Sequence, residues 1–471
     1  MDKVNVNQEQ IFGHPKGLFV LFFTEMWERF SYYGMRAILV LFLVAKSEDG
    51  GMGWDKPEAL ILYGVYTALV YVMAIPGGIL ADRYLGQKKS VLLGAVLLVI
   101  GPLFLTLEGF VPSTLQATFF FTGLGIIILG VGALKPNIST MVGSLYHPKD
   151  NRRDMGFTIF YIGINLGAFL SGLIVASVAA NFGWHFGFGV SAIGMILGLI
   201  VYTSGQKYLE GVDVKVNEEN KQLKNSSSSQ ALSKKEKDRL VVLSISFLVV
   251  IVFWGAFEQA GGLMNIYAQE KVNRFVGDFE IPAGWFQSVN SLYIMIFGTL
   301  VAAFWVRWGK MGRESSSLFK MAVGTIIMGL GFLFMIGATH QLVYDAQGEI
   351  VQKASMMWLF GAYFLHTIGE LCLSPVALSF VTRLAPAKYT SMVMGVFFAM
   401  TGFGNLLAGS LGALSASLGD EEIFKLIVIV SVGVGVVLLA FLSKLKKLTH
   451  GADNESSYPS KDLEGELDLQ Q

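Results

Sequence analysis

The sequence predicts an all-α membrane protein with about twelve transmembrane helices in two six-helix bundles. Hydrophobic residues make up 53% of the 471-residue chain and charged residues only 15%, against roughly 25% charged residues in soluble proteins. The apolar residues gather in long runs, and one polar segment divides these runs into two sets of six. A soluble protein with this much apolar surface would aggregate, so we expect lipid to be the solvent.

The first set of runs forms a predicted N-terminal bundle over residues 17–202, after a polar N-terminal segment, residues 1–16. A spanning helix needs roughly 20 mostly apolar residues. The runs of this length are Gly17–Ala45, Glu58–Leu80, Lys89–Leu107, Ser113–Gly143, Met155–Ala179 and Gly183–Tyr202. The polar start and the length of the first run are unlike a cleaved signal peptide, so we expect this run to remain as the first span.

The second set forms a predicted C-terminal bundle over residues 240–445, followed by a polar tail, residues 446–471. Its runs are Leu240–Tyr267, Gly284–Trp308, Ser317–Gly337, Ala354–Leu384, Tyr389–Leu418 and Ile423–Leu442. Residues 203–239, between the bundles, are rich in Lys, Glu, Asn and Ser. This composition predicts a solvated linker.

The basic residues predict how the chain is oriented. Lys and Arg are concentrated in the loops after the second, fourth, eighth and tenth spans, in the linker and at the start of the tail. The loops after the third, fifth and eleventh spans contain no Lys or Arg. By the positive-inside rule, both termini and the linker are predicted to be cytoplasmic. We expect a multi-pass protein of the cell inner membrane.

Composition also excludes some functions. The net charge is zero, which argues against a nucleic acid as partner. Cys372 is the single cysteine, so the chain cannot form an internal disulfide or a cysteine-based zinc site. We predict no metal ligands, no catalytic residues and no cofactor.

Several ionisable residues fall inside the predicted spans, where each one costs several kcal/mol if it faces lipid. They are Glu25, Glu28, Arg29, Arg36, Lys135, Glu258 and Glu370. The spacing of the first three places them on one helix face. We expect the set to face a shared polar interior, where carboxylates beside cations that can change partner are suited to proton coupling. The alternative is a network of ion pairs that only locks the helices together.

These charges lie within motifs that resemble those of the proton-dependent oligopeptide transporter (POT) family of the major facilitator superfamily, which includes bacterial di- and tripeptide transporters. Glu25–Gly34 resembles the ExxERFxYYG motif of that family. The other matching segments are Gly77–Gly86, Lys135–Ser139, Phe160–Gly167, Phe257–Gln259, Phe286–Asn290 and Gly369–Pro375. They follow one another from the first to the tenth span in the expected order.

The resemblance implies a major facilitator fold and proton-coupled uptake of di- and tripeptides by alternating access, with the protein functional as a monomer. It implies proton-coupling roles for Glu25, Glu28, Glu258 and Glu370. It implies substrate-binding roles for Arg29, Tyr32, Tyr33, Arg36, Tyr71, Lys135, Tyr161, Asn165, Asn290 and Glu370. It also implies two gating pairs, Arg36 with Glu258 and Lys135 with Glu370.

The sequence departs from the family pattern in two places. The linker is too polar for the two extra helices that many bacterial relatives carry there, and Gly64 occupies the place of the second-span histidine of animal relatives. Proton handling is therefore expected to depend on carboxylates.

Two other functions are considered. One is a major facilitator transporter for another small polar or anionic solute, such as a nucleoside, nitrate or a drug. The other is an intramembrane enzyme or receptor, but the chain has no HExxH motif, no nucleophile with its base and no sizeable soluble module. No ATP-binding loop is present either, so we expect coupling to an ion gradient.

Overall fold

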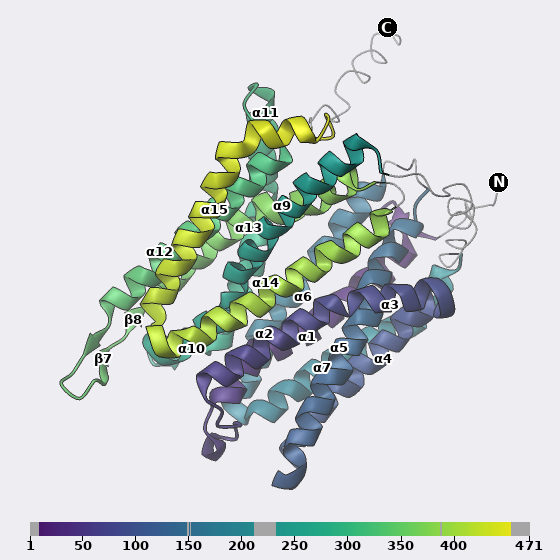
Figure 1. Ribbon diagram of the computed structural model, residues 1–471. Coiled ribbons are helices and arrows are strands. Elements are labelled where there is room, and N and C mark those ends of the chain that lie inside the picture. Colours follow the sequence, from purple (N-terminus) through teal and green to yellow (C-terminus); the bar gives the residue numbers. More distant parts are fainter. Residues whose placement is uncertain (1–8, 148–149, 151, 212–231, 387–388, 454–471) are drawn as a thin grey trace.

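The computed structural model describes residues 9–147, 150, 152–211, 232–386 and 389–453. The centre of the predicted linker and most of the predicted tail lie outside the described residues. Within this part of the chain the structure is almost entirely helical (Figure 1).

Six crossings make up the N-terminal lobe, and their ranges follow the predicted runs to within a few residues. The second crossing consists of two helices in succession. The helices are α1 (Lys16–Val44), α2 (Lys56–Val72) with α3 (Ala74–Leu80), α4 (Gln87–Glu108), α5 (Ser113–Ser144), α6 (Arg152–Phe182) and α7 (Trp184–Ser204).

Six further crossings make up the C-terminal lobe. The helices are α9 (Lys234–Phe257) with α10 (Leu263–Lys271), α11 (Gln287–Lys310), α12 (Ser317–Gln341), α13 (Met357–Leu384), α14 (Thr390–Leu418) and α15 (Asp420–Leu448). Eleven crossings in the described part of the chain are long and apolar enough to span a membrane. The remaining one, α1, has 29 residues and carries the four charged residues of the first predicted span. The predicted fold class is confirmed.

Two predicted spans are interrupted. The second one breaks at Met73, between α2 and α3, because Pro76 has no N–H to donate to the carbonyl of Val72. The seventh changes into a short 3₁₀ helix, η4 (Glu258–Ala260), before α10 begins. Gly261 follows η4, and a Cβ there would lie 1.9 Å from the hydroxyl oxygen of Tyr63. Glycine therefore lets the chain of one lobe approach a side chain of the other.

The helix ends differ from the apolar runs where polar residues stabilise a helix beyond the apolar segment. α9 begins six residues before the predicted Leu240, because Ser233 and Glu236 form a reciprocal capping box. α15 is extended at both ends, with acidic residues in its first turn and Lys446 and Lys447 in its last, an arrangement that suits the helix dipole.

Short segments that the sequence analysis did not predict lie between the helices. The tenth predicted span starts at Ala354, but Ala354–Ser355 is a strand, β8, and α13 begins only at Met357. β8 pairs in parallel with β3 (Val272–Asn273), which ties the loop before α13 to the end of α10. The other strands are β1 (Gln10–Ile11), β2 (His14–Pro15), β4 (Phe275–Val276), β5 (Phe279–Glu280), β6 (Val343–Tyr344) and β7 (Ile350–Gln352). The remaining 3₁₀ and π turns are η1 (Ser47–Asp49), η2 (Ala81–Leu85), η3 (Gln206–Leu209) and η5 (Ala283–Phe286).

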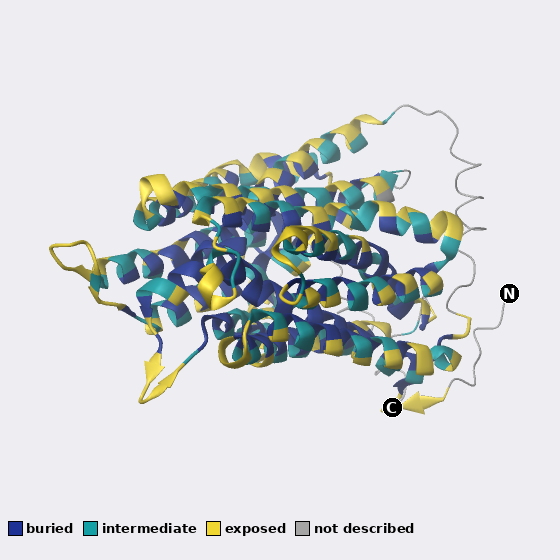
Figure 2. Ribbon diagram, turned by 90° about the horizontal axis from the view of Figure 1, so that it is seen from below, coloured by how far each residue is buried: buried dark blue, intermediate teal, exposed yellow. Residues whose placement is uncertain are grey.

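The two lobes lie side by side, with α2 packed along α14 and α6 against α11. The start of α1 and the end of α15 lie towards one end of the bundle, which we call the termini side, and α10, β7 and β8 lie at the opposite side (Figure 1). Buried residues fill the interior of each lobe, and exposed residues cover its outer faces (Figure 2). Since successive crossings run in opposite directions, each helix end can be assigned to the termini side or the opposite side from its place along the chain.

Candidate functional site

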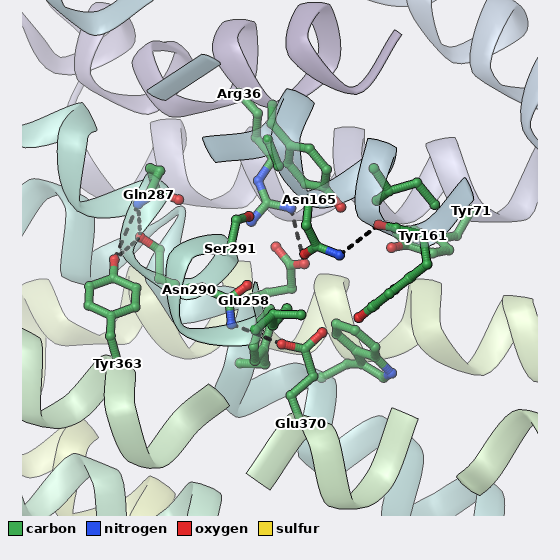
Figure 3. A pocket seen from close by; sticks show the side chains of 17 residues that line it. Arg36, Tyr71, Tyr161, Asn165, Glu258, Gln287, Asn290, Ser291, Tyr363 and Glu370 are labelled. Atoms are coloured by element: carbon green, nitrogen blue, oxygen red, sulfur yellow. Dashed lines mark hydrogen bonds and ion pairs between the residues drawn. The ribbon is translucent and has the colours of Figure 1, made fainter. Parts of the chain in front are cut away.

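A cavity of about 140 Å³ lies between the lobes. Residues from α1, α2 and α6 of one lobe and from α9, η4, α11 and α13 of the other face it (Figure 3). Eight of the predicted site residues line it: Tyr33, Arg36, Tyr71, Tyr161, Asn165, Glu258, Asn290 and Glu370. Side chains that are far apart in the sequence thus share one polar interior.

Glu370 supplies the carboxylate of the C-terminal wall. It projects from α13 into the cavity (Figure 3), and its Oε2 accepts a hydrogen bond from Asn290 Nδ2 at 2.9 Å. The same amide donates to Thr367 Oγ1 at 3.1 Å. In the described part of the chain no cation forms an ion pair with Glu370, so its neighbours orient the carboxylate without neutralising it.

The opposing wall is aromatic and polar. Tyr33, Tyr71 and Tyr161 line it together with Asn165, whose amide donates to the carbonyl of Tyr161 at 2.9 Å on the preceding turn of α6. Gly167 allows α6 to reach this position, since a Cβ there would lie 2.1 Å from the carbonyl oxygen of Met26 on α1.

A buried ionic cluster lies behind this aromatic wall. Arg29 Nε is 2.9 Å from Glu25 Oε1 and 2.5 Å from Glu28 Oε2, and all three side chains are at most 3% exposed. Nη2 has no hydrogen-bond partner among the described residues. Arg29 is therefore shared by two carboxylates and keeps one donor nitrogen without a partner in this part of the chain.

Lys135 belongs to the same cluster. Its Nζ lies 4.0 Å from the centre of the Tyr71 ring, and it interacts electrostatically with Glu28 and Glu25. The guanidinium carbon of Arg29 lies 5.8 Å from the ring centre of Tyr33. Since Tyr33 and Tyr71 both line the cavity, one aromatic layer separates the cations from it.

The two residues of the first predicted gating pair, Arg36 and Glu258, are in contact. Arg36 Nη1 donates to Glu258 Oε1 at 3.2 Å across the lobes, and the Tyr63 hydroxyl donates to the other carboxylate oxygen at 3.3 Å. Arg36 is 7% exposed and Glu258 1%. The pair is therefore shielded from bulk water, and each charge depends on the other.

Further bonds join the lobes near this pair. Asn265 Nδ2 donates to the carbonyl of Ala37 at 2.9 Å, and Ser288 Oγ to the carbonyl of Phe169 at 2.7 Å. Trp285 Nε1 donates to Ser177 Oγ at 2.8 Å. Every hydrogen bond or ion pair between the lobes that involves only described residues lies in the half towards the opposite side, so the lobes are closed there.

The second predicted gating pair is not formed in this structure. Lys135 lies against the Tyr71 ring and Glu370 is bonded to Asn290, and the two described side chains make no ion pair. While the lobes are joined at the opposite side, each of these two groups contacts residues of its own lobe. Their pairing stays a prediction for a different arrangement of the lobes.

Tyr32 also differs from the cavity tyrosines. It is 5% exposed, does not line the cavity, and packs edge-to-face with Tyr33 at 5.4 Å between ring centres. Its hydroxyl has no hydrogen-bond partner in the described part of the chain.

The sequence analysis did not identify some residues that line the cavity. Gln287, Tyr363 and Trp254 belong to this group, and Gln287 Nε2 donates to the carbonyl of Ala260 and to the Tyr363 hydroxyl. Each lies one or two helical turns before a predicted residue. Spacings of three, four or seven residues place side chains on one helix face, and that signal would have found them.

The chain is similar to known transporters over nearly its whole length. The profile described as "POT family" matches residues 88–226 and 208–421. The peptide transporter YePEPT of Yersinia enterocolitica is 34% identical, over 85% of this chain and 88% of its own length. The di-/tripeptide transporter of Lactococcus lactis subsp. cremoris is 31% identical, over 95% of this chain and 99% of its own.

A solved structure is similar as well. The crystal structure of a mutant of peptide transporter POT in complex with alafosfalin is 33% identical and superimposes with a TM-score of 0.84, covering 94% of this chain and 97% of that one. This likeness agrees with the major facilitator fold implied by the sequence motifs.

Proposed function

This chain belongs to the POT family, and we propose that it is a secondary active transporter that takes up di- and tripeptides by proton-coupled symport and alternating access. Members of this family are transporters and not enzymes. The observation that supports the proposal most strongly is a cavity with an unpaired carboxylate on one wall and two cations behind the other.

A peptide is a zwitterion, so a site for it needs opposite charges at its two ends. In our proposal Glu370 receives the peptide ammonium group, and Arg29 or Lys135 receives the peptide carboxylate. Charge-assisted hydrogen bonds of this kind are about twice as strong as neutral ones. Asn165 and Asn290 would bind the peptide backbone, which is the same in all peptides whatever their side chains. The distance between the two charged ends would then limit peptide length and leave side-chain identity free.

Proton coupling would follow from the contact of Arg29 with two carboxylates, those of Glu25 and Glu28. While Glu25 and Glu28 are both ionised, they hold Arg29 and attract Lys135. Protonation of either acid removes one negative charge and frees a cation for the substrate carboxylate. Proton and peptide would then each favour binding of the other, because such coupling is reciprocal, and a proton gradient would drive uptake.

Alternating access would exchange one gate for the other. Arg36 with Glu258 holds the opposite side closed, and Glu258 is a second place at which a proton could act. Lys135 with Glu370 would pair when the lobes rock and the termini side closes. The site at the interface of two lobes is typical of transporters that work in this way.

We also propose the setting in which the protein works. The basic loops support a cytoplasmic location for the termini side. In our proposal the protein lies in the cell inner membrane, and the cavity opens inwards when the outer gate is closed. The cavity lies within a single chain, so a monomer would suffice. Protons are the only coupling ion proposed, without a resident cofactor.

Blocked peptides test the substrate assignment. We would measure counterflow of labelled dialanine in proteoliposomes, with competition by dialanine, N-acetyl-dialanine and dialanine amide. Free dialanine is expected to compete at least about tenfold better than either blocked form, because each block leaves a buried charge unpaired. In Glu370→Gln the penalty for the acetyl group is expected to shrink while the penalty for the amide remains. Equal competition by blocked peptides, or stronger competition by a nucleoside or nitrate, would contradict the proposal.

A further inference from the structure

A second cavity, of about 470 Å³, lies on the outer face of the C-terminal lobe, away from the site between the lobes. It is formed where the termini-side halves of α11 and α12 meet α13. The lining residues are almost wholly apolar: Leu300, Val301, Phe304, Trp305, Trp308, Phe319, Val323, Ile327, Ile368 and Cys372. Leu300 is 60% exposed and Phe304 50%, so this groove is open to the surroundings of the protein. We propose that the groove binds an anionic phospholipid, with an acyl chain in the groove and the phosphate at its basic rim.

The length of the groove suits one acyl chain. Phe319, Val323 and Ile327 follow one another at intervals of four residues along α12, which amounts to about 12 Å at 1.5 Å per residue. A single leaflet of the hydrocarbon core is roughly 15 Å deep. The groove thus runs from the membrane surface on the termini side towards the bilayer centre.

Aromatic rings form the half of the groove that lies nearest the termini side. Phe304, Trp305 and Trp308 contact one another with ring centres 5.3–6.5 Å apart, and Trp305 meets Phe319 at 6.1 Å. Trp305 is 9% exposed, and its indole ring lies beside Cys372 in the wall of the groove. Trp308 follows it by nearly one turn of α11 towards the termini side. Indole rings of this kind are common at the boundary between acyl chains and headgroups.

The rim of the groove is basic. Arg307, Lys310, Arg313 and Lys320 lie at its termini-side end. The guanidinium carbon of Arg313 is 4.4 Å from the ring centre of Trp308, and Lys320 Nζ is 5.5 Å from that of Trp305. Cations are thereby fixed to the same rings that line the groove. Glu314 is the acid between residues 307 and 320, and Lys446 Nζ binds its Oε2 at 2.7 Å. Since Lys446 balances Glu314, the charges of Arg307, Lys310 and Arg313 give this end of the groove a net positive charge, which suits an anionic headgroup.

Fluorescence quenching tests the site directly. Purified protein in detergent would be titrated with phosphatidylglycerol or phosphatidylcholine that carries brominated acyl chains. We expect phosphatidylglycerol to quench at about tenfold lower concentration, as two or more basic residues near a phosphate imply. Trp305→Phe with Trp308→Phe is expected to remove this high-affinity component.

Charge variants separate the headgroup contribution from non-specific attraction. Arg313→Gln with Lys320→Gln is expected to bring phosphatidylglycerol to the level of phosphatidylcholine, and Arg313→Lys with Lys320→Arg to keep the preference. The matched control, Lys234→Gln with Lys237→Gln, removes two exposed charges at the start of α9 and should leave the preference unchanged. The proposal would be wrong if the two lipids quenched equally, if the tryptophan variant kept the high-affinity component, or if the control lost the preference as well.

Discussion

At the scale of single residues, ionised groups in this protein are compensated by charges on other turns or other helices. Arg29 is shared by Glu25 and Glu28, and Arg36 is paired with Glu258 across the lobes. Glu370 differs, since among the described residues it accepts a hydrogen bond from the neutral amide of Asn290 and forms no ion pair. Protonation of Glu25 or Glu28 would weaken the hold on Arg29. The Glu370 carboxylate would be able to bind a cationic group of a ligand.

The shared guanidinium gives the first prediction. Glu28→Gln keeps the shape of the side chain but fixes one partner of Arg29 in the neutral form. Gradient-driven uptake of dialanine is expected to be lost, because no proton is needed to free the cation, while counterflow without a gradient persists. Uptake and counterflow in proteoliposomes measure the two. Concentrative uptake at the wild-type level would refute the role of Glu28.

The buried gating pair gives the second prediction. Arg36→Gln leaves the carboxylate of Glu258 with Tyr63 alone, and an unpaired buried charge costs roughly 3–5 kcal/mol. The double variant Arg36→Gln with Glu258→Gln leaves no such charge and is expected to recover most of the loss in thermal stability. The melting temperatures of wild type, both single variants and the double variant in detergent complete the cycle. Additive losses would show that the two residues do not interact.

The sequence allowed most of these residues to be predicted, for a physical reason. Charges inside apolar runs cannot face lipid, so Arg29, Lys135 and Glu370 had to face the interior. Which charges meet depends on how the lobes are placed, and helix periodicity within one lobe carries no such information. In the structure Arg36 and Glu258 form an ion pair, whereas Lys135 contacts the Tyr71 ring and Glu370 contacts Asn290.

At the scale of elements, glycines determine how closely the helices of the two lobes approach. A Cβ on Gly64 of α2 would lie 2.8 Å from the Cα of Gly409 on α14 and 3.0 Å from the carbonyl oxygen of Asn405. These neighbours are backbone atoms and cannot move aside. The absence of a histidine at Gly64 thus has a packing reason in this chain.

Gly64→Ala is predicted to impair transport and lower the melting temperature, since α2 and α14 would have to separate. Gly433→Ala on α15 is the matched control, because a Cβ there has no atom within 4 Å and alanine favours a helix by roughly 0.5–1 kcal/mol over glycine. Dialanine uptake and the melting temperature of both variants test this prediction. Equal behaviour of the two would contradict the close packing of α2 on α14.

The element boundaries show where sequence analysis reaches its limit. Apolar length predicted each crossing, but the breaks at Met73 and around Gly261 arise from a proline and from contact with the other lobe. Pro76 and the pair Gly261-Gly262 can be read from the sequence. The contact of Gly261 with Tyr63 was not, because it joins residues nearly 200 positions apart.

At the scale of the whole molecule, the hydrogen bonds and ion pairs that join described residues of the two lobes all lie towards the opposite side, so relative motion of the lobes is the expected working movement. We predict that dialanine at acidic pH shortens the distance between spin labels at Ser144 and Thr382, in a Cys372→Ser background. Both positions are exposed, at the termini-side ends of α5 and α13. Pulsed electron resonance measures the distance. A label pair within one lobe, at Lys89 and Ser144, should not change, and an unchanged distance across the lobes would argue against alternating access.

Coupling of peptide movement to protons is the central claim, and uptake by the wild-type protein tests it most directly. Proteoliposomes with an alkaline lumen are expected to accumulate dialanine above the outside concentration, and dissipating the gradient with a protonophore should stop accumulation at equilibration. Equal accumulation with the pH gradient in either direction, or no movement of peptide at all, would contradict proton-coupled uptake.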